Sequence, residues 1–226
     1  MSTLPLFDPT TVPVVAVDTQ LPPIAADRLL AQAIAARFAH PPHDWEPELR
    51  TERRFSDRAP AHAAVLIPLV LREPLSVLLT QRTTRLSSHS GQIAFPGGKV
   101  DPGDANPVAT ALRETEEEIG LPPEKVRVLG ALPIYTTGSA FIVTPVVGLV
   151  EAGFSLRPNE HEVADVFEVP LPFLMNPSHH RHHEVKFEGE SRRWLSMPYQ
   201  DASTERFIWG ATAGMLRNLY RFLAHA

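Results

Sequence analysis

The most informative feature of this 226-residue sequence is one helix whose two ends are both marked. Asn106 is a good N-cap, and Pro107 suits the first helical position because a backbone N–H there would have no helical partner. Gly120 can adopt the left-handed conformation that ends a helix, and the two prolines that follow soon after cannot continue it. The sequence therefore predicts a helix over Pro107–Ile119, which the rest of the fold must accommodate.

This helix has an acidic face beside an apolar one. If Glu114 is placed at 0°, Glu117 falls at about −60° and Glu118 at about +40°. Glu116 points away from this acidic face. The apolar stripe comprises Val108, Leu112, Thr115 and Ile119. Like charges on adjacent turns repel by a few tenths of a kcal/mol per pair, and a divalent cation between them reverses that sign. The acidic face is therefore either a solvated surface or a site where a cation bridges carboxylates to phosphates.

Short strands are predicted on both sides of the helix. They are the aliphatic runs at 62–71, 76–81, 92–95, 126–132, 141–150 and 163–169, separated by Gly, Pro and polar turns. A hairpin is expected at 185–197, and amphipathic helices at 27–38 and 207–223. With 43% hydrophobic residues, the chain is typical of one domain. We expect a mixed sheet with flanking helices over 61–226, and an N-terminal extension, 1–60, that packs on it.

Composition excludes several classes of function. A net charge of −5 argues against binding nucleic acid or an anionic membrane surface. The sequence has no cysteine, which excludes disulfides and thiolate metal sites. No apolar run approaches the roughly 20 residues that span a bilayer, and the N-terminus lacks the pattern of a signal peptide. We therefore expect a cytoplasmic protein that binds a small molecule, and we also consider a homodimer.

Paired glycines precede the helix in the segment Phe95-Pro96-Gly97-Gly98-Lys99. They permit a tight turn and let backbone groups approach a metal or a phosphate closely. With the helix, this segment resembles the Nudix box: Gly, five residues, Glu, seven residues, Arg-Glu, an aliphatic, any residue, Glu-Glu, any residue, Gly, an aliphatic. The matching residues are Gly98, Arg113, Glu114, Glu117, Glu118, Gly120 and Leu121. The departures are Asp104 in place of Glu, Thr115 in place of an aliphatic, and one extra residue between Asp104 and Arg113.

The resemblance implies an α+β Nudix fold, an α/β/α sandwich whose mixed sheet is flanked by helices. It also implies metal-dependent hydrolysis of a diphosphate, with Mg²⁺ or Mn²⁺ as cofactor. In this family the three glutamates supply metal ligands, the arginine orients them, and the carbonyl of the first glycine often contributes. By position, the metal-binding residues are Gly98, Glu114, Glu117 and Glu118, and the catalytic residues are these glutamates with Arg113.

Residues 78–98 resemble the extended motif of one subfamily, the coenzyme A diphosphatases. The matching residues are Leu78, Leu79, Thr80, Arg82, Gly91, Phe95, Pro96, Gly97 and Gly98. Ser87 stands where the subfamily has a second arginine, with Arg85 two residues earlier. The resemblance implies cleavage of coenzyme A to 4′-phosphopantetheine and adenosine 3′,5′-bisphosphate. The candidate substrate-binding residues are Arg82, Arg85, His89, Gln92, Phe95 and Lys99. For the two arginines the alternative is a role in surface solubility, and for His89 it is a turn.

Downstream residues carry weaker signals. Glu160 and Glu162 precede a predicted strand, where a loop could supply a general base or a further ligand, although we favour a surface turn. The histidine cluster His179, His180, His182 and His183 has spacings found in zinc sites, but we favour an exposed loop. Trp194 and Trp209 are interpreted as core or interface residues.

Three other functions stay open at this stage. One is a Nudix hydrolase for another nucleoside diphosphate derivative, such as ADP-ribose or a dinucleotide. The second is a non-catalytic module that binds a nucleotide, against which the complete acidic face argues. The third is a metal-storage or structural protein that uses the histidine cluster.

Overall fold

The long strand β2 (Ala61–Val70) lies at the centre of the larger sheet and is buried on both faces. The computed structural model describes residues 8–84, 91–187 and 190–225. Ala64, Leu66 and Val70 of β2 belong to one hydrophobic cluster, whereas Ile67 and Leu69 belong to another. Because successive side chains of a strand point to opposite faces of the sheet, each face has its own core. The sheet therefore needs a covering layer on both sides.

Two sheets are formed by the described residues. The larger one has the order β4-β3-β2-β8-β6, with β5 paired to β2, β7 to β8 and β9 to β3. Its strands, besides β2, are β3 (Ser76–Arg82), β4 (Ile93–Ala94), β5 (Gly97–Lys99), β6 (Val126–Ala131), β7 (Tyr135–Thr136), β8 (Phe141–Val150) and β9 (Val163–Pro170). The smaller one has the order β1-β10-β11-β12, from β1 (Val14–Val17), β10 (Arg181–Phe187), β11 (Glu190–Asp201) and β12 (Thr204–Trp209). The larger sheet is mixed, because β2 and β8 run parallel whereas its other pairings are antiparallel.

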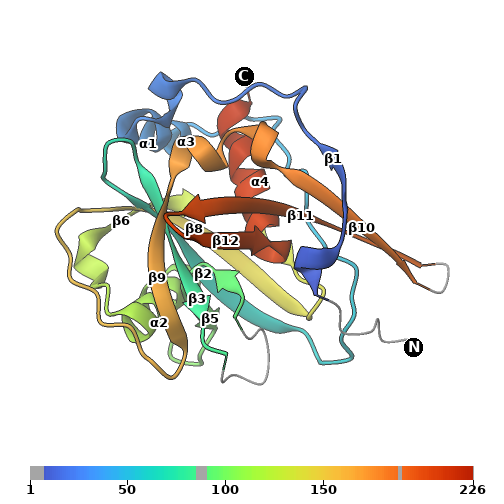
Figure 1. Ribbon diagram of the computed structural model, residues 1–226. Helices are drawn as coiled ribbons and strands as arrows, with labels where there is room; N and C mark the ends of the chain where they lie inside the picture. Colours follow the sequence, from blue (N-terminus) through green and yellow to red (C-terminus); the bar gives the residue numbers. More distant parts are fainter. Residues whose placement is uncertain (1–7, 85–90, 188–189, 226) are drawn as a thin grey trace.

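Helices cover both sides of the larger sheet, as expected for the α+β class (Figure 1). Helix α2 (Pro107–Ile119) packs through Ala111 and Ile119 on one face. Helix α4 (Gly210–Ala224) and the smaller sheet lie on the other, with α1 (Ala31–Ala39) and the short α3 (Leu171–Leu174). Four 3₁₀ turns complete the described elements: η1 (Pro9–Thr11), η2 (Ala26–Leu29), η3 (Pro123–Lys125) and η4 (Pro177–His179). None of the described helices is long and apolar enough to cross a membrane.

The ends of α2 confirm the prediction from sequence. The Asn106 side chain accepts a hydrogen bond from the backbone N–H of Ala109 at 3.0 Å. Gly120 has a φ of 70°, and its N–H donates to the Glu116 carbonyl. The predicted hairpin is also confirmed, as β10 and β11.

Two predicted helices have different bounds in the structure. The helix expected over 27–38 is divided into η2 and α1 by an extended Leu30, which buries Leu29 and leaves Leu30 47% exposed. The helix expected over 207–223 begins only at Gly210, which has a φ of 62°. The residues before Gly210 extend β12, because Trp209 pairs with Ser196 of β11. Both errors arise where a contact between distant segments overrides local helix propensity.

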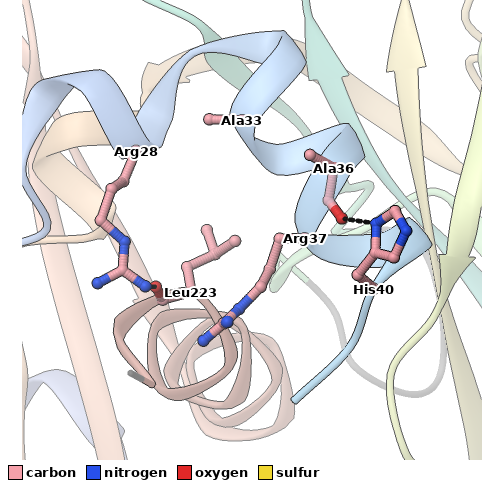
Figure 2. Close-up of a pocket in the computed structure, with 6 residues that line it drawn as sticks. All are labelled: Arg28, Ala33, Ala36, Arg37, His40 and Leu223. Atoms are coloured by element: carbon pink, nitrogen blue, oxygen red, sulfur yellow. Dashed lines mark hydrogen bonds between the residues drawn. The ribbon is translucent and has the colours of Figure 1, made fainter.

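A hollow of about 340 Å³ lies between α1 and the end of α4 (Figure 2). Its lining residues are Arg28, Ala33, Ala36, Arg37, His40 and Leu223. Arg28 donates to the Leu223 carbonyl, and Arg37 donates to the Phe222 carbonyl at 3.1 Å. Cations suit this position because the last carbonyls of a helix lack helical partners and carry partial negative charge. Arg28 and Arg37 therefore attach the N-terminal segment to the end of α4. None of the residues that line the hollow belongs to the predicted site.

The histidine cluster is not an exposed loop, so that expectation is wrong. His180 is fully buried after η4, and His183 is 3% exposed in β10. The His183 ring contacts the Ser196 hydroxyl at 2.7 Å and stacks on Trp194. In the described part of the chain, no three His, Cys, Asp or Glu side chains are grouped to hold a metal ion. The segment was predicted to be a loop because it is polar, but part of it forms β10, in which His183 contacts other polar groups inside the fold.

His180 is expected to make stability depend on pH. Its Nε2 lies 2.8 Å from the Leu174 carbonyl and its Nδ1 lies 3.0 Å from Arg217 Nη1, so the neutral Nε2–H form satisfies both contacts. Burial lowers the pKa of His180 to about 4. The unfolded chain takes up this proton near pH 6.5, so between pH 6.5 and 4 the unfolded state binds more protons and stability falls as the pH falls. The contribution is on the order of 3 kcal/mol.

Urea unfolding at several pH values measures this effect. We expect the loss of unfolding free energy between pH 6.5 and 4 to be smaller in His180→Gln, whose amide can replace both hydrogen bonds. A wild-type ring that takes up its proton near pH 6.5 in an NMR titration would contradict the prediction.

Candidate active site

The acidic face of α2 lies against β5, because α2 packs on β2 and β5. Glu114 approaches the backbone there so closely that a Cβ atom on Gly98 would overlap its carboxylate. Gly97 has a φ of 149° and faces the backbone of β2 at a similarly close approach. The paired glycines therefore let the sheet backbone approach a carboxylate, which no larger residue would permit here.

Glu118 is the buried member of the acidic face, with 5% of its surface exposed. Its Oε2 accepts the Gly97 N–H at 3.1 Å, and its Oε1 lies 3.7 Å from Arg82 Nη1. Burial raises the pKa of Glu118 to about 7. The negative charges of Glu162 and Glu114 also raise this pKa, against the effect of the two donors. The ionised form of Glu118 is therefore costly unless a cation lies close to it.

Arg113 forms ion pairs with the acidic side chains at the more exposed edge of this face. Its Nε and Nη2 each lie 2.9 Å from an oxygen of Asp104, in a bidentate pair. It also contacts Glu114 at 3.1 Å and Glu117 at 3.0 Å. The bonds from Arg113 hold the pKa of Asp104 well below its usual range, with a further contribution from the Thr110 hydroxyl. Asp104 thus anchors the arginine that contacts the two glutamates.

Glu162 approaches the acidic face from the loop before β9. Its charge is one cause of the raised pKa of Glu118, and its backbone carbonyl accepts the Thr83 N–H at 2.9 Å. Glu160, two residues earlier, is exposed. Residues 160–162 form the expected turn, in which Glu162 is half-buried, and the pairing of β9 with β3 brings this turn beside Arg82.

The predicted substrate-binding residues lie in different environments. Arg82, whose side chain is 27% exposed, contacts the acidic face, and its backbone N–H donates to the Gln92 carbonyl at 2.9 Å. Lys99 is exposed at the end of β5, where its carbonyl accepts a hydrogen bond from Arg113. Arg85 and His89 lie outside the described residues.

The structure contradicts the prediction that Phe95 binds substrate. Its side chain is 3% exposed and packs in the core on the α4 side of the sheet. Ile93, two residues earlier, is 5% exposed and packs in the same cluster. The alternation of an extended chain directs both side chains inward, so the Phe-Pro-Gly-Gly segment contributes backbone rather than the phenyl ring to this region.

The donor chemistry of the acidic face fits a hard divalent cation. Glu114, Glu117 and Glu118 supply carboxylate oxygens, and the backbone at Gly98 lies close to the Glu114 carboxylate. In the described region these carboxylates do not converge on one point, because Arg113 binds Glu114 and Glu117. Glu117 is 60% exposed, so its ion pair with Arg113 costs little to break. The like charges around buried Glu118 are the observation that favours a cation here.

Sequence reasoning did not identify two features of the site. The first is the pair of Asp104 with Arg113, although the departure at Asp104 and the extra residue marked the place. The second is the Gly97 N–H, which donates to Glu118. The second has no sequence signal of its own, and the partner in each depends on how a loop or strand lies against α2.

Comparison with known proteins identifies the family. The NUDIX domain model matches residues 60–206. The uncharacterized Nudix hydrolase NudL of Photorhabdus laumondii is 43% identical over 167 residues, which cover 74% of this chain and 87% of that protein. NudL of Escherichia coli K12 is 45% identical over 158 residues, which cover 70% of this chain and 80% of that protein.

A solved structure, that of a C. elegans Ap4A hydrolase binary complex, aligns with a TM-score of 0.41 at 23% identity, over 49% of this chain and 80% of that one. Similarity at this level does not bear on the substrate. The family model, in contrast, spans more than half of the chain, and the NudL relatives are matched over most of their length. The chain therefore belongs to the Nudix hydrolase family, whose enzymes act on phosphorus-containing anhydrides and generally use divalent metal ions.

Proposed function

We propose that this Nudix hydrolase cleaves the diphosphate of coenzyme A or one of its derivatives, giving 4′-phosphopantetheine and adenosine 3′,5′-bisphosphate. The observation that supports the proposal best concerns Arg82, the arginine of the coenzyme A diphosphatase motif. Arg82 lies 3.7 Å from Glu118 and its buried Nε has no hydrogen-bond partner among the described residues. The Arg82 side chain is 27% exposed, so its terminal Nη groups can donate to a phosphate beside the acidic face.

In the proposed reaction, Mg²⁺ or Mn²⁺ ions held by Glu114, Glu117, Glu118 and the Gly98 carbonyl would activate water and stabilise charge on the leaving phosphate. Arg113 orients Glu114 and Glu117 through its ion pairs, and Asp104 fixes Arg113. Glu162 is our candidate for the carboxylate that removes the proton of the attacking water, because Asn159 links its carboxylate to the Glu118 carbonyl and its charge acts on Glu118.

A panel of substrates tests this proposal. We expect coenzyme A and acyl-coenzyme A to be hydrolysed faster than ADP-ribose or NADH in the presence of Mg²⁺ or Mn²⁺, with the two products above resolved by chromatography. Glu118→Gln protein serves as the blank for contaminating activity. A preference for ADP-ribose or NADH would replace coenzyme A with another nucleoside diphosphate derivative. Binding of these compounds without turnover would instead favour a non-catalytic module.

A further inference from the structure

The loop that carries Glu162 is attached to the C-terminal end of α2. The Arg157 N–H donates to the Ile119 carbonyl at 2.8 Å, and the Asn159 N–H donates to the Glu118 carbonyl at 2.9 Å. Gly120 permits this attachment, because a Cβ there would lie 3.0 Å from the Arg157 nitrogen. Two carbonyls that the helix itself leaves without partners are satisfied by the loop. The loop is thus held against the residue that carries the buried carboxylate.

Asn159 also organises the loop internally. Its Nδ2 donates to Glu162 Oε1 at 3.3 Å, and its Oδ1 accepts the His161 N–H at 3.1 Å. Its carbonyl accepts the N–H groups of Glu162 and Val163, at 2.9 and 2.8 Å. One residue is therefore bonded to the backbone of Glu118 and to both the backbone and the carboxylate of Glu162. An amide suits this position because it offers a donor and an acceptor together.

We propose that Asn159 is a positioning residue that holds the Glu162 carboxylate beside Glu118, in the geometry needed for proton removal. The proposal rests on the role of Glu162 in the proposed function. A purely structural role is the competing explanation, because the Oδ1 contact with His161 closes a common turn. The two roles use different atoms of one side chain, so substitutions can separate them.

Asn159→Asp is the discriminating variant. An aspartate keeps the oxygen that accepts the His161 N–H, but it replaces the donor to Glu162 with a second negative charge. A structural role predicts normal activity for this variant. A positioning role predicts a kcat lower by about 10- to 100-fold with a KM within about twofold, because general-base catalysis depends on alignment more than binding does.

The test compares kcat and KM of the wild type, Asn159→Asp, Glu162→Gln and the double variant, on whichever diphosphate of the panel the wild type hydrolyses fastest. We expect Asn159→Asp to have less than about a twofold effect in the Glu162→Gln background, because the group that it positions has lost its function. Asn176→Asp is the matched control, since the Asn176 Oδ1 accepts the Ser178 N–H at 3.1 Å in a similar turn at η4. Its kcat should be normal.

Wild-type kcat in Asn159→Asp overturns the proposal, and so does an equal loss in both backgrounds. A normal kcat in Glu162→Gln would also overturn it, while leaving diphosphate hydrolysis intact. Substrate preference is measured separately in the wild type, so an error about coenzyme A does not affect this outcome. Thermal unfolding of each variant shows whether a loss of activity reflects a loss of fold.

Discussion

Glu118→Gln is expected to lower kcat by about 1,000-fold or more while the protein stays folded. The substitution keeps the shape of the side chain and leaves an oxygen that can accept the Gly97 N–H, but it removes a charged oxygen ligand. A bound metal ion stabilises transition-state charge by several kcal/mol, and about 4 kcal/mol corresponds to a factor of about 1,000 in rate. Steady-state kinetics with saturating Mg²⁺ or Mn²⁺ measure the loss.

The same substitution is expected to leave stability unchanged or to raise it when no metal is present. Burial raises the pKa of Glu118 to about 7, whereas in the unfolded chain it titrates near its ordinary value of 4.5. Between these values the folded state binds the extra proton, so the wild type loses stability as the pH rises from 4.5 to 7, on the order of 3 kcal/mol. Glutamine removes this dependence, which urea unfolding in a chelator at pH 5 and pH 8 can detect.

Glu116→Gln is the matched control, because Glu116 is an exposed glutamate of the same helix that points away from the acidic face. Its activity should stay within about twofold of the wild type. Near-normal turnover in Glu118→Gln would contradict the assignment of this carboxylate to the metal site. A stability loss as large as the activity loss would show instead that Glu118 has a mainly structural role.

Arg217→Met is expected to destabilise the fold by about 3–5 kcal/mol. Arg217 is 2% exposed, and it contacts Asp18 at 2.8 Å, Glu48 at 2.8 Å and His180 at 3.0 Å. Methionine has a similar length but no charge, so Asp18 and Glu48 lose the buried cation that they share and keep His182 and Arg221 as partners. Removing one partner of a buried ion pair has a cost in this range because the remaining charge stays desolvated. Chemical denaturation at pH 7 measures the change.

Arg221→Met provides the comparison. Arg221 also contacts Glu48, but its side chain is 37% exposed, so its loss should change the unfolding free energy by less than about 1 kcal/mol. Adding Asp18→Asn and Glu48→Gln to Arg217→Met should recover part of the stability, because the unpaired charges are then absent. An Arg217→Met protein within about 1 kcal/mol of the wild type would show that this network contributes little.

The strands and hairpins that follow local patterns could be predicted, and the errors share one cause. The burial of Phe95 and the partners of His180 depend on which segments pack together. The division of the first helix at Leu30 accompanies the burial of Leu29 in the core. Periodicity describes how side chains alternate along one segment, but it does not specify what lies opposite them.

Helix α2 and the composition of its acidic face follow from local sequence signals. The N-cap, the first-turn proline and the left-handed glycine act over a single helix length, and the helical repeat places Glu114, Glu117 and Glu118 on one side whatever surrounds them. These are local interactions, so they do not require knowledge of the fold.

The environment of those glutamates depends on how distant segments pack around them. The pairing of β9 with β3 brings Glu162 and Arg82 to Glu118, and the approach of β5 places the Gly97 N–H on the same carboxylate. A loop contact decided that Asp104 anchors Arg113. Burial and neighbouring charge set the chemistry of a carboxylate, and both come from segments far away in the sequence.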